Sequence, residues 1–471
     1  MGNVEEKSGD YKIALFIAVL AGFLTPFDLS AVNIALPTIG REFAMDAVSM
    51  SWIPTAYLLT SAIFLVPIGR VADIYGRKKV CTVGLSLFTL ASISMILSPI
   101  VPFIILSRVW QGVGGAFIFG TAIAILTSLA PRGERGKALG IYTTAVYLGL
   151  SFGPSIGGFM TDHLGWRSIF LINIPIGVVA VSLLIFRLRG EWADAQGERF
   201  DLHGSLLYGL MLLALIYGLS MLPSTEATGI ILAGAALFIL FLWYEWHTRS
   251  PLIDLYLFRY NRRFAFSNLA ALLNYSATFA VTFFLSLYLQ YIGRLSPSEA
   301  GLILIVQPVI QALFASSAGY LSDRVDPGKV ASAGMALNAI ALLSLALLDE
   351  GSSIAHLGII LFVMGAGLAF FSSPNTNAIM SSVEPKCYGV ASGTLGTMRL
   401  MGQMLSMAIA MMLIAIFMGR VEIIPEQYSG LLGAMKAGFL VFACLCIVGI
   451  FASLSRGEAV EEERGICRVD R

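Results

Sequence analysis

The chain has 471 residues, 57% of them apolar and only 13% charged, whereas about a quarter of the residues of a soluble domain are charged. This composition excludes an ordinary soluble protein and indicates a chain surrounded by lipid. The formal net charge is +1, so no overall field favours nucleic acid as a partner. The four histidines are scattered and the cysteines lack metal-site spacing, so we expect no metal site, no hydrolytic triad and no cofactor.

Apolar runs of about 20 residues, the length that spans a bilayer, follow one another along almost the whole chain. The polar residues 1–12 before the first run lack the pattern of a cleaved signal peptide, and we expect them to be retained. Fourteen runs are found, at 13–36, 50–69, 80–98, 102–126, 138–160, 168–186, 204–222, 228–246, 264–290, 299–320, 329–348, 354–376, 390–417 and 434–454.

The distribution of cations supports this count. With both termini in the cytoplasm, inner segments carry 23 of the 30 Lys and Arg residues, outer segments carry five, and Arg108 and Arg399 lie within runs. Adding or removing one helix would destroy this alternation, which follows the positive-inside rule. The sequence therefore predicts a multi-pass protein of the cytoplasmic membrane with both ends inside.

A short basic stretch between the second and third runs recurs later in the chain. In Gly69–Lys79 a glycine is followed four positions later by Asp73, and then by Gly76 and lysine; Gly319–Lys329 repeats this order around Asp323. The offset of 250 residues defines two halves. Both copies fall on the predicted inner face, where Asp73 can pair with cations such as Arg77 or face a helix N-terminus. The simpler interpretation is a basic anchor, but the repeat favours a conformational role for Gly69, Asp73, Gly76, Arg77 and Asp323.

The repeat predicts two six-helix bundles with two extra helices between them, an all-α membrane fold. We expect an N-terminal bundle at 1–190, a two-helix insertion with linkers at 191–260, a C-terminal bundle at 261–456 and a cytoplasmic tail at 457–471. Parallel six-helix repeats with a site between them are typical of alternating-access transporters.

Asp28 is the only acidic residue deep within any run, two positions after Pro26. Removal from water disfavours the charged form of a carboxylate, which suits the uptake and release of a proton. Arg108 is a cation inside an apolar run and needs a partner in the protein interior. We therefore predict that Asp28 and Arg108 couple transport to protons, although sequence cannot show whether they meet. A permanently hydrogen-bonded structural carboxylate is the alternative.

Other polar residues in the runs are candidates for a substrate cavity or for contacts that hold helices together. As cavity residues we predict Asn33, Gln111, Asn274, Gln307, Gln311 and Arg399. In the fifth run, small residues permit close helix contact and a proline bends the helix; simple packing explains them equally well. The gating candidates here are Gly149, Gly153, Pro154 and Gly157.

Five motifs in order resemble the major facilitator superfamily over essentially the whole chain. Gly69–Lys79 resembles its hairpin signature, Arg108–Gly112 its fourth-helix motif, and Gly149–Gly158 the fifth-helix signature associated with antiporters. Phe27–Pro37 and Gly165–Gly177 resemble the branch of fourteen-helix drug/proton antiporters. The resemblance implies the major facilitator fold of two six-helix bundles plus two extra central helices.

The resemblance also implies proton-coupled efflux of amphiphilic, drug-like small molecules by alternating access, with the proton gradient as energy source. Export of one dedicated metabolite or organic anion is the alternative, because the runs contain two candidate cavity cations, Arg108 and Arg399, and one acid, Asp28. An enzyme is not expected, since no cluster of His, Asp or Glu lies at one depth, and no G-x-x-x-x-G-K-[ST] motif for ATP occurs. The expected partners are a small-molecule substrate, protons and the bilayer, and we expect a functional monomer.

Overall fold

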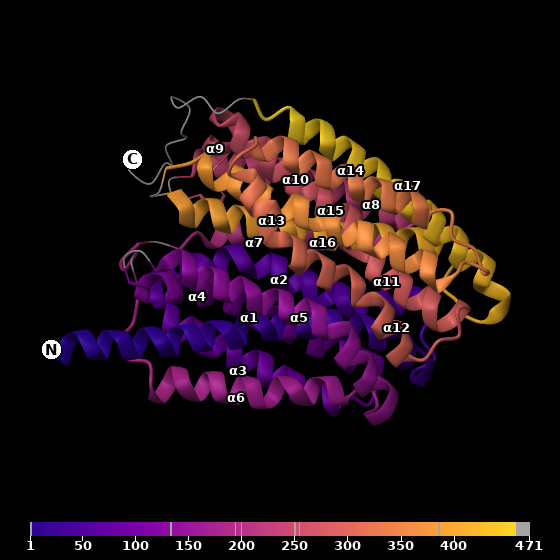
Figure 1. The fold of residues 1–471 in the computed structure, drawn as a ribbon, viewed down its shortest axis with the longest axis horizontal. Helices are drawn as coiled ribbons and strands as arrows, with labels where there is room; N and C mark the ends of the chain where they lie inside the picture. The colour runs from indigo at the N-terminus through magenta and orange to yellow at the C-terminus, as the bar shows by residue number, and fades with distance from the viewer. Residues whose placement is uncertain are drawn as a thin grey trace. The chain divides into compact units, whose positions relative to one another are not determined.

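The computed structural model describes residues 2–131, 134–193, 195–198, 200–248, 251–253, 255–384 and 387–457. These residues form long helices joined by short turns (Figure 1). The helices of the first half are α1 (Gly2–Glu42), α2 (Ala47–Tyr75), α3 (Arg77–Ile96), α4 (Val101–Leu129), α5 (Arg135–Leu164) and α6 (Ser168–Phe186). They are followed by α7 (Leu202–Met221), α8 (Thr225–His247), α9 (Leu255–Tyr260), α10 (Arg262–Thr278), α11 (Ala280–Leu287), the π-helical turn η1 (Tyr288–Ile292), α12 (Pro297–Leu304), α13 (Val306–Ser322), α14 (Pro327–Leu345), α15 (Ile354–Ser381), α16 (Tyr388–Phe417), η3 (Pro425–Gln427) and α17 (Tyr428–Leu454).

Every one of the fourteen predicted runs lies in a helix or in consecutive helical pieces. Among the described residues, thirteen helical segments are long and apolar enough to cross a membrane. The remaining run lies in α5, which is 30 residues long and contains Pro154. Two runs are each built from more than one piece: α10, α11 and η1 form one, and α12 with α13 forms another. The prediction of an all-α membrane protein with about fourteen spans is confirmed.

The chain divides into two compact units. The first consists of residues 1–44, 52–202 and 295–305, and thus contains α1 and α3 to α6, most of α2, and α12. The second consists of residues 45–51, 203–294 and 306–471. The predicted domain boundaries remain predictions, and the predicted tail lies outside the described residues except for Gly457.

Matching glycine contacts occur in both units. In the first unit, a Cβ on Gly114 of α4 would lie 2.8 Å from the carbonyl oxygen of Gly84 on α3. In the second, a Cβ on Gly367 of α15 would lie 2.8 Å from the carbonyl oxygen of Gly334 on α14. Without side chains at these positions the two backbones of each pair touch, as small residues allow in membrane helices. The same helix pair is therefore built twice.

A second matched contact joins the first and fifth helices of each half. A Cβ on Gly149 of α5 would lie 2.5 Å from the Phe23 carbonyl oxygen on α1. A Cβ on Gly402 of α16 would lie 2.7 Å from the Leu272 carbonyl oxygen on α10. In the repeat, α10 therefore corresponds to α1 and α16 corresponds to α5, as the repeated hairpin motif predicts.

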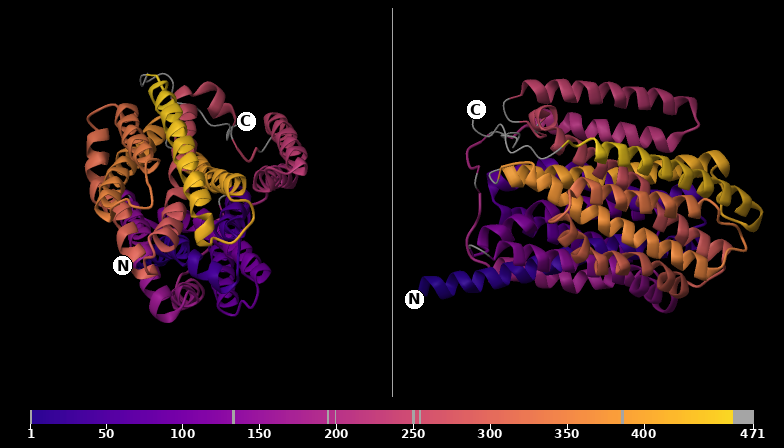
Figure 2. Two further views of the ribbon diagram at one scale, coloured as in Figure 1. Left: turned by 90° about the vertical axis from the view of Figure 1, so that its right-hand side faces the viewer. Right: turned by 45° about the horizontal axis from the view of Figure 1, so that its top comes forward.

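The two extra helices, α7 and α8, form an antiparallel pair (Figure 2). The pair is closed by small residues: a Cβ on Gly234 would lie 2.9 Å from the Leu215 side chain. The rings of Tyr208 and Phe241 lie 5.5 Å apart across it. Both rings are buried, so this helix pair has a small core of its own.

The close approach of α1 and α5 provides a test of this packing. We expect Gly149→Ala to destabilise the protein by about 1–3 kcal/mol, because the added methyl group meets rigid backbone. Gly140, on the same helix, has nothing within 4 Å of an added Cβ, and Gly140→Ala should be neutral or stabilising by up to about 1 kcal/mol. Thermal unfolding of the purified protein in detergent measures both. Equal stability of the two variants would contradict the contact.

Candidate functional site

Asp28 and Arg108 meet inside the first unit. Asp28 lies on α1 and Arg108 on α4, and both side chains are fully buried. Arg108 Nη1 donates a hydrogen bond to Asp28 Oδ2 at 2.6 Å. Pro26 lies two residues before Asp28 within α1, and a proline weakens the backbone hydrogen bonding of the turn that precedes it. The carboxylate thus lies two residues after a proline that removes one backbone hydrogen bond from α1, next to a buried cation.

Three further polar side chains complete a network around the ion pair. Gln111, one turn after Arg108, accepts from Arg108 Nη1 at 2.7 Å and donates to Ser92 Oγ on α3 at 2.9 Å. Asn173 Nδ2 on α6 donates to Asp28 Oδ1 at 2.7 Å. All three are buried. Four helices therefore converge on one carboxylate.

The Arg108 guanidinium also contacts α2. Its Nε donates to the Ile53 carbonyl oxygen at 3.2 Å, and its Cζ lies 4.7 Å from the centre of the Tyr57 ring. Such a cation–π contact helps to hold a desolvated cation. Arg108 Nη2 and Asn173 Oδ1 are buried without a hydrogen-bond partner among the described residues. The network can therefore rearrange its hydrogen bonds when the charge on Asp28 changes.

The predicted fifth-helix residues contact two neighbours. Added Cβ atoms on Gly153 and Gly157 would meet Ser30 and Ala31 of α1 at 2.5 and 2.7 Å. On another face of α5, Gly158 lies against the Pro297 carbonyl oxygen of α12, and Gly301 of α12 lies against the Pro154 carbonyl oxygen. This reciprocal contact brings α12 against α5 with no room for a methyl group on either side.

The first hairpin is closed by its own ion pair. Arg77 Nη2 lies 2.7 Å from Asp73 Oδ1, and Arg77 Nη1 donates to Ser128 Oγ on α4 at 3.0 Å. Gly76, between α2 and α3, has φ +117°, a conformation that favours glycine. A Cβ on Gly69 would meet nothing within 4 Å, whereas a Cβ on Gly120 of α4 would lie 3.7 Å from the Gly69 nitrogen. The structure therefore brings Asp73, Gly76 and Arg77 together and places Gly69 beside α4.

The connector after α6 lies against this hairpin. Glu191 Oε1 accepts from the Lys78 backbone N–H at 2.7 Å, so it supplies the carboxylate at the N-terminus of α3. Two backbone hydrogen bonds follow: Arg77 N–H donates to the Trp192 carbonyl at 2.8 Å, and Ala195 N–H donates to the Asp73 carbonyl at 2.9 Å. The hairpin and the connector thus form one hydrogen-bonded assembly.

The second hairpin has different partners. Asp323 accepts from Asn377 Nδ2 on α15 at 3.1 Å, and Asp326 caps α14 by accepting from the Lys329 backbone N–H at 3.1 Å. Nearby, Arg456 Nη2 donates to Asn375 Oδ1 at 2.6 Å. The pKa of Arg456 is lowered to about 9, chiefly by burial and also by the charge of Arg263, while Asp326 acts in the opposite direction.

The predicted cavity residues belong to both units, with Asn33 and Gln111 in the first and Asn274, Gln307, Gln311 and Arg399 in the second. Gln111 belongs to the Asp28 network. Asn274 accepts from Asn338 Nδ2 at 3.0 Å. Arg399 donates to the Tyr275 hydroxyl at 2.7 Å and lies over its ring, with Cζ 4.9 Å from the ring centre. The remaining predicted positions are a buried Asn33 on α1 and, one turn apart on α13, Gln307 and Gln311.

Three residues of these sites were missed by sequence reasoning. Asn173 lies within the motif Gly165–Gly177 and is the only amide of the sixth run, which is a signal that could have identified it. Ser92 gives no such signal, because a serine in a membrane helix is common. Glu191 lies in a connector with several acidic residues, and the sequence does not distinguish it from the others.

The chain belongs to the major facilitator superfamily. The model of that family matches residues 18–293 and 267–465. The chain is 32% identical over 443 residues to the riboflavin transporter RibZ of Clostridioides difficile, covering 94% of this chain and 96% of the relative. It is 30% identical over 403 residues to the multidrug resistance protein Stp of Mycobacterium tuberculosis (strain CDC 1551 / Oshkosh), covering 84% and 74%. The expected resemblance is confirmed, and the chain is a multi-pass membrane transporter rather than an enzyme.

Solved structures support the same fold. A POT family transporter in complex with 5-aminolevulinic acid matches 94% of this chain and 95% of its own, with a TM-score of 0.72 and 15% sequence identity. At that identity the likeness concerns the fold alone.

The buried ion pair makes a prediction about stability. Arg108→Leu should cost about 3–5 kcal/mol, because it leaves Asp28 buried without its cation. The double variant Asp28→Leu/Arg108→Leu removes both charges and should recover most of this loss. Thermal unfolding in detergent compares the native chain with the two variants. A double variant less stable than Arg108→Leu would contradict the pairing.

Proposed function

We propose that this transporter exports amphiphilic small molecules in exchange for protons, with Asp28 as the coupling carboxylate. The observation that carries this proposal is the fully buried Asp28–Arg108 ion pair. An ion pair in lipid is costly and is a marker of function more often than of stability. Relatives such as the multidrug resistance protein Stp support the substrate class.

Coupling follows from the charge of Asp28. When the carboxylate is ionised, Arg108 and Asn173 hold it between α4 and α6. Protonation neutralises the carboxylate and removes the ion pair, while Arg108 keeps its contacts with Gln111, the Ile53 carbonyl and Tyr57. The two charge states therefore favour different arrangements of these helices. A proton shifts the balance of two access states by its difference in affinity for them.

The packing of α5 supports the conformational part of the proposal. Its glycines make tight contacts with α1, which carries Asp28, and with α12. Two helices whose backbones touch without intervening side chains are either packed together or apart, so such a contact can act as a two-state element. We propose that the contact between Gly158 and Pro297 is made in one access state and broken in the other. The predicted cytoplasmic position of both termini belongs to the same proposal.

Dedicated export of one metabolite is the second candidate. The relative RibZ is named as a riboflavin transporter and covers nearly the whole chain. Arg399 on Tyr275 offers a cation next to an aromatic ring, which suits a planar substrate that carries hydrogen-bond acceptors. Riboflavin is therefore the natural second test substrate beside a lipophilic cation.

Transport into liposomes with an imposed pH gradient tests the proposal. We expect the pH gradient to drive transport of ethidium by the native chain against the ethidium concentration gradient. Asp28→Asn should reduce gradient-driven transport to the level of protein-free liposomes. Exchange of ethidium across the membrane in the absence of a pH gradient should be unchanged in this variant. Glu42→Gln is the matched control, because it removes a carboxylate from an exposed ion pair with Arg167; it should transport like the native chain.

The outcomes separate the candidates. Proton-driven transport of riboflavin without any transport of ethidium would replace the first proposal by the second. Gradient-driven ethidium transport that survives Asp28→Asn would contradict the role of Asp28.

A further inference from the structure

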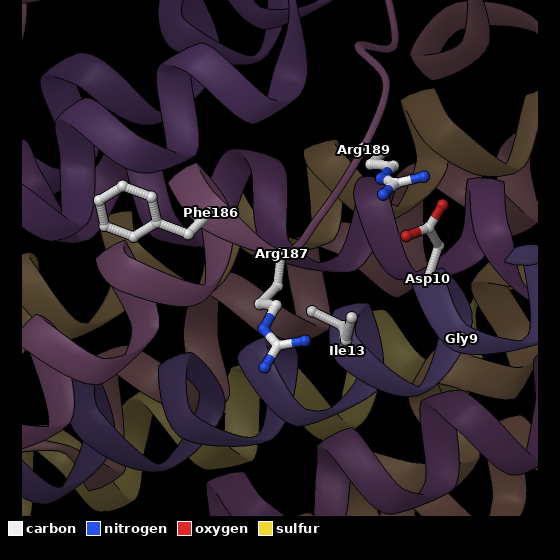
Figure 3. A pocket seen from close by; sticks show the side chains of 6 residues that line it. All are labelled: Gly9, Asp10, Ile13, Phe186, Arg187 and Arg189. Carbon is white, nitrogen blue, oxygen red and sulfur yellow. The ribbon is translucent and has the colours of Figure 1, made fainter.

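Polar side chains occur at two places along α6 and the residues that follow it. At the end of the helix, the lining groups of a pocket do not converge: Figure 3 shows the Arg187 guanidinium and the Phe186 ring pointing away from Asp10 and Arg189. These groups share no centre at which a ligand could touch all of them. In the middle of the helix, Asn173 is fully buried and belongs to the network around the proposed coupling carboxylate. Its amide has a feature that the network described above does not explain.

One amide atom of Asn173 has partners and the other has none. Its Nδ2 donates to Asp28 Oδ1 at 2.7 Å and lies 3.3 Å from Ser92 Oγ. Its Oδ1 is buried and accepts no hydrogen bond from the described residues. Buried polar atoms without a partner are rare in folded proteins, and each calls for an explanation. The oxygen is explained if its donor is present only in another charge state of the site.

The ionised carboxylate of Asp28 is surrounded by donors. Arg108 Nη1 lies 2.6 Å from Oδ2, and the amide nitrogens of Asn173 and Gln111 lie 2.7 and 3.5 Å from Oδ1. A protonated carboxyl group carries an O–H, which needs an acceptor in a buried site. A guanidinium group has no acceptor atom, so a proton on Oδ2 would point at a donor. A proton on Oδ1 finds an acceptor if an amide turns its oxygen toward Asp28.

Of the two amides, Asn173 is the one that can turn. Gln111 is engaged at both atoms, since its oxygen accepts from Arg108 Nη1 at 2.7 Å and its nitrogen donates to Ser92 Oγ at 2.9 Å. Turning Gln111 would set its NH₂ group against the guanidinium, donor against donor. A half-turn of Asn173 about its Cβ–Cγ bond instead exchanges its bonded nitrogen for its unbonded oxygen. The charge of Asp28 then decides which of the two atoms faces the carboxyl group.

The charged groups around Asp28 are few. Arg108 of α4 faces the carboxyl group, and the Arg108 guanidinium lies against the Tyr57 ring of α2. Helix α1 has no other charged residue between Lys12 and Arg41. Helix α6 has no charged or titratable residue, and the charged residues of α3, α5 and α12 lie in their terminal turns. The charge next to the Asn173 amide therefore changes with the proton on Asp28.

We propose that Asn173 is the positioning residue for the proton on Asp28. Its amide nitrogen donates to the ionised carboxylate, and after the half-turn its amide oxygen accepts from the protonated carboxyl group. The proton adds to a lone pair of Asp28 Oδ1, and no other covalent bond changes. The orientation of a side chain on α6 thereby follows the charge of a side chain on α1. This inference rests on the proposed role of Asp28 as the coupling carboxylate.

Infrared difference spectroscopy of the full chain in liposomes tests the role of Asn173. The pH is stepped from alkaline to acidic, and the C=O stretching band of a protonated carboxyl group is followed; loss of this band in Asp28→Asn assigns it to Asp28. In Asn173→Leu the band should move to higher wavenumber, because the O–H of Asp28 has lost its acceptor. Asn268→Leu is the matched control, since Asn268 is also fully buried with an amide oxygen that lacks a partner, but lies on α10 in the second unit. It should leave the band in place.

A second measurement uses the native sequence and so does not depend on the folding of a variant. Asparagine labelled with ¹³C at the side-chain carbonyl is incorporated into the chain. The pH step that protonates Asp28 should move the labelled carbonyl band of Asn173 to lower wavenumber, because this oxygen gains a hydrogen bond. The same step should cause no such shift in Asp28→Asn.

The outcomes distinguish this inference from the proposed function on which it rests. A native chain that shows no Asp28 carboxyl band at any pH would contradict the coupling role of Asp28 itself. An Asp28 band that appears in the native chain and keeps its wavenumber in Asn173→Leu would overturn the role of Asn173 and leave the coupling role in place. A labelled asparagine carbonyl that does not respond when Asp28 is protonated would overturn the role of Asn173 in the same way.

Discussion

The buried ion pair between Asp28 and Arg108 is the interaction on which the arrangement of the first unit depends. In lipid neither charge is tolerated alone, so α1 and α4 must stay in register for as long as both are ionised. Asn173 and Gln111 add hydrogen bonds from the surrounding helices. The same interaction that fixes the helices is also the one that a proton removes. In the proposed mechanism, stability and function therefore both depend on the charge of Asp28.

The two halves share their packing but not their charges. The glycine contacts between α3 and α4 recur between α14 and α15. Phe23 and Leu272 occupy equivalent positions 249 residues apart, so the position equivalent to Asp28 in the second half is Ala277. Gly114 and Gly367 are equivalent and 253 residues apart, so the position equivalent to Arg108 is Leu361. Ala277 and Leu361 are fully buried and apolar. The repeated scaffold carries an ion pair at these positions in the first half and two apolar side chains in the second, which supports the proposed coupling in the first half.

Much of the fold was predictable because lipid imposes simple rules. Apolar length located the fourteen runs, thirteen of which coincide among the described residues with helices long and apolar enough to cross a membrane, and the hairpin repeat indicated the two halves. Asp28 was identifiable as the one acid deep in an apolar run. The pairing with Arg108 could not be identified, because 80 residues separate Arg108 from Asp28 and Arg399 was a second cation within the runs. The capping role of Glu191 and the contact of Gly158 with Pro297 were equally hidden, since both depend on how segments distant in sequence fold against each other.

The central claim is that the protonation of Asp28 is linked to substrate binding and transport. Proton release on substrate binding measures this most directly, with the purified chain in weakly buffered detergent solution and a pH indicator. When ethidium is added at each of a series of pH values, the native chain should release protons in the lower part of the series, and Asp28→Asn should bind ethidium without releasing them. Equal proton release from the native chain and from Asp28→Asn would contradict the account.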